Sequence, residues 1–171
     1  MKPGPGRMAI WCALWLLPLT AAAADSSSLL RALLKPDLAT LAPEAITRRF
    51  AKLLPLERAL PFPGQLILAG GDTQQRLEFQ YIPDSAGKPL FTQAQARFLA
   101  TSAEAPFRDL ERLLRKRLGE PRYERRDDGP LPTIGWRLGQ LEVALSQTAI
   151  RDAHWVELSI VKPRVQAVSN L

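Results

Sequence analysis

The spacing of apolar residues predicts two helices in the first third of the chain. Three serines, Ser26 to Ser28, can cap a short helix over residues 29–34, which Lys35-Pro36 ends. Pro43 suits the first turn of a second helix, because its fixed φ angle is already helical, and Pro55 stops this helix. The second helix has one apolar stripe: Ile46, Phe50, Leu53 and Leu54.

A third helix is predicted over residues 107–118. Acidic residues lie in its first half and basic residues in its last turn, as the helix dipole favours. Gly119 and Pro121 follow as stop signals. Its apolar face consists of Phe107, Leu110, Leu113, Leu114 and Leu118.

Between the second and third helices the apolar period shortens to two, which predicts strands. Residues 60–64, Leu-Pro-Phe-Pro-Gly, form a stiff connector. Residues 66–68 and 77–81 alternate on either side of Gly70-Gly71-Asp72, which indicates a hairpin with one face in water. Residues 90–105 are ambiguous, and we expect a strand or irregular segment around 90–99.

Alternation returns after the third helix and predicts an antiparallel meander. A strand begins at Tyr123, a turn follows at residues 127–130, and two strands flank the turn Gly139-Gln140. The last strand covers residues 155–161. We therefore expect residues 25–171 to form a single α+β domain, with a hairpin, a C-terminal meander and about three helices on one face of the sheet.

The N-terminus has the pattern of a secretory signal peptide. Lys2 and Arg7 precede the apolar stretch 8–19, and small residues follow at 21–24. The stretch is too short to span a bilayer, which needs about 20 apolar residues. We expect cleavage after Ala23 or Ala24, so that residues 1–24 are removed, and a mature chain in the periplasm without a membrane span.

Removal of this segment changes the composition. The net charge falls from +6 to +4 with the loss of Lys2 and Arg7, and the single cysteine, Cys12, also leaves. Disulfide and thiol chemistry are therefore excluded for the mature chain. An exported domain of this size without cysteine fits a Gram-negative periplasm. The residue types present suggest no cofactor and no metal.

The most visible cluster of functional groups is basic, spanning residues 108–126. Such a surface attracts phosphate-bearing partners, although a solvated helix face with a Glu111–Arg115 pair explains much of it. Nucleic acid is not expected, because aromatic residues do not alternate with these arginines. The candidate residues for binding an anion or partner are Arg115, Lys116, Arg122, Arg125 and Arg126.

Two candidate catalytic sets are weak. His154, the only histidine, lies beside Asp152 and could act with Ser146 in a hydrolase, but no G-x-S-x-G motif is present.

Two further segments have a simpler structural explanation. Turn formation explains the paired acids Asp127-Asp128. Gly70-Gly71-Asp72 lacks the Lys-Ser/Thr of a phosphate loop.

Two tryptophans could stack on a sugar or a peptide. Trp136 and Trp155 both occupy strand positions that alternate with polar residues. At such positions we expect buried or half-buried sheet residues.

The stretch Leu113 to Pro121, followed by a strand with Trp136, resembles a pattern in small α+β proteins of the bacterial envelope. These include the small lipoproteins of outer-membrane β-barrel assembly. The chain departs from those lipoproteins because no cysteine follows the signal peptide. The resemblance implies the fold class and no function.

The expected function is that of an exported, non-catalytic module that binds an envelope protein or an anionic envelope component. One alternative is a small periplasmic hydrolase that uses His154. Another is an inhibitor or immunity protein against a wall-degrading enzyme, for which an acidic target would suit this basic chain.

Overall fold

The computed structural model describes residues 26–59, 64–100, 104–125, 132–150 and 153–163. The predicted signal peptide, most of the connector 60–64 and the turn at 127–130 lie outside these residues. The helices are α1 (Ser26–Leu33), α2 (Pro43–Phe50), α3 (Glu104–Leu118) and the short 3₁₀ helix η1 (Pro36–Thr40). The strands are β1 (Glu57–Ala59), β2 (Leu66–Gly71), β3 (Gln75–Pro83), β4 (Pro89–Ala100), β5 (Tyr123–Arg125), β6 (Thr133–Leu138), β7 (Leu141–Ile150) and β8 (Ala153–Val161).

All eight described strands form one antiparallel sheet. Their order is β1-β2-β3-β4-β8-β7-β6-β5. The predicted hairpin is β2–β3 and the predicted meander is β6–β7–β8, so the α+β prediction is confirmed. The ambiguous segment is β4, the longest strand, which pairs with β8 and so joins the hairpin to the meander.

The two halves of the sheet repeat one arrangement. α2 precedes the four strands β1 to β4, and α3 precedes the four strands β5 to β8. The last strands of the two halves, β4 and β8, pair at the centre, while the three-residue strands β1 and β5 form the two edges. The structure therefore has an approximate internal two-fold arrangement that the sequence pattern does not reveal.

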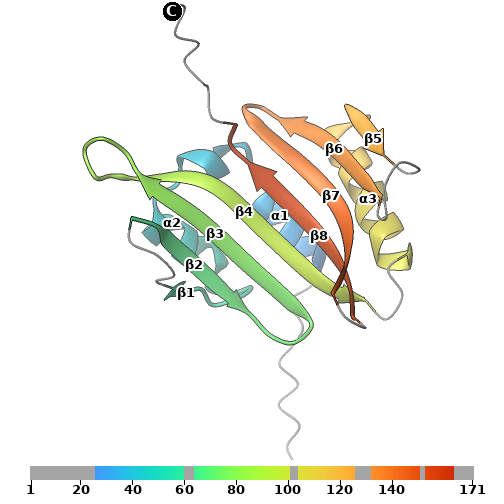
Figure 1. Ribbon diagram of the computed structural model, residues 1–171, viewed down its shortest axis with the longest axis horizontal. Helices are drawn as coiled ribbons and strands as arrows, with labels where there is room; N and C mark the ends of the chain where they lie inside the picture. Colours follow the sequence, from blue (N-terminus) through green and yellow to red (C-terminus); the bar gives the residue numbers. More distant parts are fainter. Residues whose placement is uncertain (1–25, 60–63, 101–103, 126–131, 151–152, 164–171) are drawn as a thin grey trace, which may run out of the picture.

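Each outer helix packs on its own half of the sheet. The ring of Phe50 in α2 lies 5.1 Å from that of Phe79 in β3, measured between centroids. α3 contacts β6 and β7, and Leu114 on its inner side is fully buried. In Figure 1 the helices lie behind the sheet, with α2 and α3 towards opposite ends.

The first helix fills the centre of the helical layer. α1 lies between α2 and α3 behind β4 and β8 (Figure 1). Leu29, Leu30 and Leu33 are each at most 1% exposed, and Arg31 is exposed. η1 continues from α1 and contacts β4, with Leu38 fully buried. A segment predicted only as a short capped helix is therefore the most deeply buried helix of the fold.

Strand alternation divides the sheet into a buried face and an open face. On β3, Leu77, Phe79 and Tyr81 are buried beneath the helices, and burial raises the pKa of the Tyr81 hydroxyl. Arg76 and Glu78 point to the other side. We call this second side the open face, because no described helix covers it.

An ion pair joins η1 to α2. The two terminal guanidinium nitrogens of Arg49 donate to the two carboxylate oxygens of Asp37, at 3.0 and 2.5 Å. The hydrogen bond from Arg49 lowers the pKa of Asp37. The pair orients the chain between the central helix and the helix of the first half.

We expect Leu33→Ala to lower the free energy of unfolding by about 2–5 kcal/mol, because it opens a cavity in the centre of the core. Arg31→Ala, on the exposed side of the same helix, should change it by less than about 0.5 kcal/mol. Urea unfolding of residues 25–171 measures both changes in the free energy of unfolding. Equal effects of the two variants would show that α1 is not part of the core.

The Asp37–Arg49 pair should stabilise the fold only while Asp37 is ionised. Because the folded pKa is below the usual value of about 3.9, this contribution is complete above that pH and is lost as pH falls through the folded pKa. Asp37→Asn should cost up to about 1 kcal/mol at neutral pH, since the pair is partly exposed. Unfolding curves from pH 7 downwards should converge for the two proteins, whereas a constant gap would contradict this assignment.

Candidate functional site

The C-terminal end of α3 positions the predicted basic residues. The backbone N–H of Gly119 donates to the Arg115 carbonyl at 2.9 Å, with Gly119 at a φ of 82° that favours glycine. The indole N–H of Trp136 donates to the Gly119 carbonyl at 3.1 Å. After the turn, the backbone N–H of Arg122 donates to the Gly135 carbonyl of β6 at 2.7 Å, which begins the pairing of this segment with the sheet. The turn is thus fixed to β6 at both of its ends.

Arg115 is the centre of an ion-pair network. Its guanidinium donates to Glu111 at 3.0 Å, to Glu120 at 2.5 Å and also to Glu124. The hydrogen bonds that Arg115 donates to Glu124 and Glu111 raise the pKa of its guanidinium group. The side chain is 28% exposed, and its donors are directed to protein carboxylates. Its role in the structure is to join α3 to β5.

The other predicted cations remain directed to solvent. Lys116, Arg117, Arg122 and Arg125 are exposed, and within the described ranges none of them forms an ion pair. We call these four residues the basic end. The sequence predicted three of them, and Arg126 lies outside the described residues. The carboxylates of Glu111, Glu120 and Glu124 point to Arg115, which leaves the basic end available to an anion.

The basic end curves around the edge strand β5. Glu124 faces the helices, where it meets Arg115. Its neighbours Tyr123 and Arg125 therefore face the open side, because adjacent strand residues alternate. The Tyr123 ring covers Gly135 so closely that a Cβ there would lie 2.1 Å from a ring carbon. A glycine in β6 thus allows an exposed tyrosine to lie flat beside the basic end.

The structure separates the residues of the predicted hydrolase. Ser146 is paired with Glu157 in β8, whereas His154 is paired with Ala149. Residues three apart on a strand lie on opposite faces, so Ser146 and His154 do not meet. His154 is exposed, and Asp152 lies outside the described residues.

The two tryptophans occupy different faces. Trp136 is 2% exposed beneath the helices, as its hydrogen bond to Gly119 requires. Trp155 is partly exposed on the open face, where it pairs with Leu99 in β4 and Thr148 in β7. The expectation of buried or half-buried tryptophans is confirmed.

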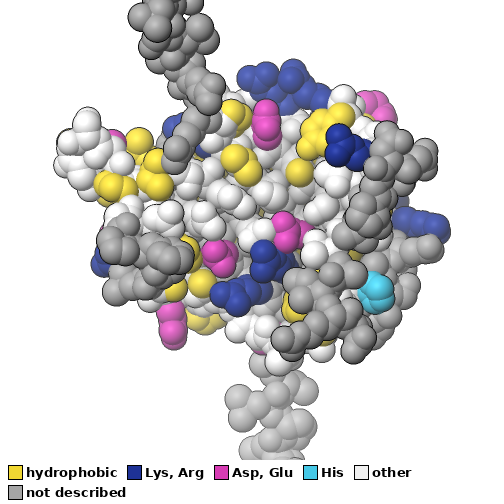
Figure 2. Space-filling model, viewed as in Figure 1, with side chains coloured by type: hydrophobic (Ala, Val, Ile, Leu, Met, Phe, Trp, Pro, Cys, Tyr) yellow, Lys and Arg dark blue, Asp and Glu magenta, His cyan; other side chains and the backbone are white. Residues whose placement is uncertain are grey.

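The open face carries ordered polar side chains at its centre. The amide of Gln95 donates to Glu157 at 2.6 Å, and Arg97 donates to Glu157 at 2.9 Å and to Gln95 at 3.0 Å. Figure 2 shows this face as mostly uncharged, with scattered cations and carboxylates. The charges and hydrogen-bonding groups of Gln95, Arg97 and Glu157 are paired with one another, so the centre of this face attracts neither anions nor cations strongly.

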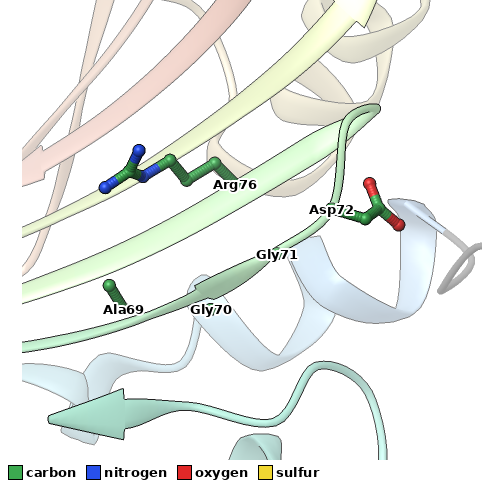
Figure 3. Close-up of a pocket in the computed structure, with 5 residues that line it drawn as sticks. All are labelled: Ala69, Gly70, Gly71, Asp72 and Arg76. Carbon is green, nitrogen blue, oxygen red and sulfur yellow. The ribbon is translucent and has the colours of Figure 1, made fainter.

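A shallow hollow of about 230 Å³ lies at the β2–β3 hairpin, where Figure 3 shows its lining residues. The prediction of a hairpin here is confirmed, but Gly70 and Gly71 are the last paired residues of β2, and the turn itself begins at Asp72, whose carboxylate accepts hydrogen bonds from the backbone N–H groups of Gln74 and Gln75. A terminal guanidinium nitrogen of Arg76 lies 3.8 Å from a carboxylate oxygen of Glu78. The hollow is smaller than typical small-molecule sites of about 300–1,000 Å³.

Metal ligands are not gathered in the described part of the chain, where no three His, Cys, Asp or Glu residues converge. Among the described helices, none has the length and apolar character needed to cross a membrane. Comparison of the chain with protein-family models, curated proteins and solved structures gives no significant match.

The contact between Tyr123 and Gly135 should show in a double-mutant cycle. Gly135→Ala alone should be destabilising, since its methyl group displaces the ring. In a Tyr123→Ala background the same change should be tolerated, with a coupling energy of about 0.5–3 kcal/mol from chemical unfolding. Additive effects would contradict the placement of the ring.

Proposed function

We propose that this chain is an exported, non-catalytic binding protein of the bacterial periplasm. We further propose that its basic end binds phosphate groups of an anionic envelope component. The N-terminal signal pattern supports the export. The observation that carries the binding proposal is the division of charges at the end of α3, where Arg115 holds the nearby carboxylates and the basic end does not.

Phosphate fits this arrangement chemically. Arg117, Arg122 and Arg125 offer planar guanidinium groups that can donate two parallel hydrogen bonds to phosphate oxygens. Lys116 adds a mobile point charge on the adjacent helix turn. The hydrogen bonds of Gly119 and Arg122 hold the backbone between these side chains, so fewer degrees of freedom are lost when an anion binds.

A catalytic role has less support. The hydrolase hypothesis relied on His154 together with Ser146 or an acid, and the sheet places Ser146 and His154 on opposite faces. The inhibitor or immunity hypothesis stays an alternative. It requires a protein partner, whereas the present proposal requires binding of phosphate alone.

Calorimetric titration of the mature chain with inorganic tripolyphosphate tests the proposal. We expect binding that weakens as salt is added, because exposed charges are screened. The double variant Lys116→Gln/Arg122→Gln should bind at least about tenfold more weakly, since hydrogen bonds to charged groups contribute about 1.5–3 kcal/mol each.

The matched control is Arg76→Gln/Arg137→Gln, which removes the same charge from the open face. It should lower the affinity by less than about twofold, because these positions lie outside the basic end. Equal losses of tripolyphosphate affinity in the two double variants would show that the net charge of the protein, and not the basic end, accounts for the binding. Absence of any tripolyphosphate binding would contradict the proposal.

A further inference from the structure

The described charges are divided unequally between the two sides of the molecule. Strand alternation and pairing place four cations and four carboxylates on the open face, so its net charge is zero. These residues are Arg76, Arg97, Arg125, Arg137, Glu57, Glu78, Glu142 and Glu157. The excess positive charge of the described chain must therefore lie elsewhere.

The excess lies in the helical layer, by which we mean the helices and the segments on their side of the sheet. The cations there are Arg31, Lys35, Arg48, Arg49, Lys52, Arg58, Arg108, Arg112, Arg115, Lys116, Arg117 and Arg122. The described carboxylates are Asp37, Glu44, Asp109, Glu111, Glu120 and Glu124. Twelve cations against six carboxylates give this side a net positive charge among the described side chains.

Cations of all three helices point away from the sheet. On α2, Arg48 lies opposite the buried Ile46 and Phe50, and Lys52 follows one turn later. On α3, Lys116 lies opposite the buried Leu114. Because the helices cover one face of the sheet (Figure 1), these side chains emerge on the same side of the molecule. Arg31 is exposed on α1 between them.

Several carboxylates of the layer are already paired. Asp37 binds Arg49, Asp109 binds Arg112, and three glutamates bind Arg115. Within the described part of the chain no ion pair involves Arg31, Lys35, Arg48, Lys52 or the cations of the basic end. The outer surface of the helices thus presents unpaired cations that are spread across the whole layer.

We infer that the helical layer docks on the planar surface of a bilayer that contains anionic phospholipids, with the open face directed away from it. The inference rests on the proposed function, because three residues of the basic end, Lys116, Arg117 and Arg122, belong to the docking surface, whereas Arg125 lies on the open face at the sheet edge. A small polyanion can contact the basic end alone. Only an extended, flat anionic surface also meets Arg48 in α2 and Lys52 in the turn that follows this helix.

Docking of this kind is electrostatic and reversible. The large apolar side chains that are exposed in the described chain are Leu90 in β4 and Tyr123 in β5, and neither belongs to a helix. No apolar anchor in the described helices therefore adds to the attraction, which should fall as salt is added. Each cation near an anionic surface contributes about 1 kcal/mol, which corresponds to about fivefold in partitioning.

Cosedimentation of the mature chain with phosphatidylcholine vesicles, with and without phosphatidylglycerol, tests the inference. Binding should require phosphatidylglycerol. The α2 variant Arg48→Gln/Lys52→Gln and the basic-end variant Lys116→Gln/Arg122→Gln should each reduce partitioning about 25-fold, at about fivefold per cation. The open-face control Arg76→Gln/Arg137→Gln should change it less than about twofold.

Titration with tripolyphosphate separates the two proposals. The α2 variant should retain tripolyphosphate binding while losing vesicle binding. If it retains both, the docking inference is wrong and the proposed phosphate site stands. If vesicle binding depends on both helical patches but the mature chain binds no tripolyphosphate, the proposed phosphate site is wrong and the docked orientation stands.

Tryptophan fluorescence reports the orientation of the docked protein, because the mature chain contains two tryptophans, Trp136 and Trp155. Trp136 is 2% exposed, so acrylamide quenching reports mainly on Trp155, on the open face. Quenching should be unchanged when the protein binds vesicles. Protection of Trp155 would place the open face on the bilayer and overturn the inference.

Discussion

Burial of α1 at the centre of the helical layer is the interaction on which the rest of this structure depends. Eight strands form a sheet too wide for α2 and α3 to cover between them. The inner sides of the central strands β4 and β8 need a third element, which α1 and η1 supply with Leu29, Leu33 and Leu38. Without this element the apolar inner side of the central strands would be exposed to water, and the two halves would be joined by the β4–β8 pairing and its open-face side chains alone.

The same arrangement determines where the charges lie. Apolar residues of all three helices must face the sheet, so their charged residues emerge on the side away from it. The sheet, in turn, pairs its charged residues across strands, as in the Arg97–Glu157 bond. These two packing requirements decide where the charged residues lie, and the sequence of the helices makes most of those on the helical side cationic. The phosphate-bearing surface proposed as the partner is complementary to that side.

The sequence predicted the elements better than their assembly. The third helix and the meander have clear periods and stop signals, such as Gly119, which takes the expected positive φ angle. A strand was predicted from Tyr123, where β5 begins, but the edge strand β1 was not predicted, because its three exposed residues carry no alternation. One sheet was predicted, but the pairing of β4 with β8 joins residues far apart in the chain, so local patterns could not predict which strands connect the hairpin to the meander.

The candidate site shows the same limit. The spacing of Glu111 and Arg115 predicts their pair on α3, and the structure contains it. The addition of Glu120 and Glu124 depends on the path of the chain after the helix, so the sequence placed Arg115 with the binding residues. The cations Arg48 in α2 and Lys52 in the following turn were also overlooked, although Glu44, Arg48 and Lys52 recur every four residues in the sequence.

Native-state hydrogen exchange of residues 25–171 tests the central role of α1 most directly. If α1 holds the two halves together, the amides of its last turn, from Leu30 to Leu33, should exchange only by global unfolding, with the same free energy as the central amides of β4 and β8. Exchange of these α1 amides through local opening, at a clearly lower free energy than that of β4 and β8, would contradict the account.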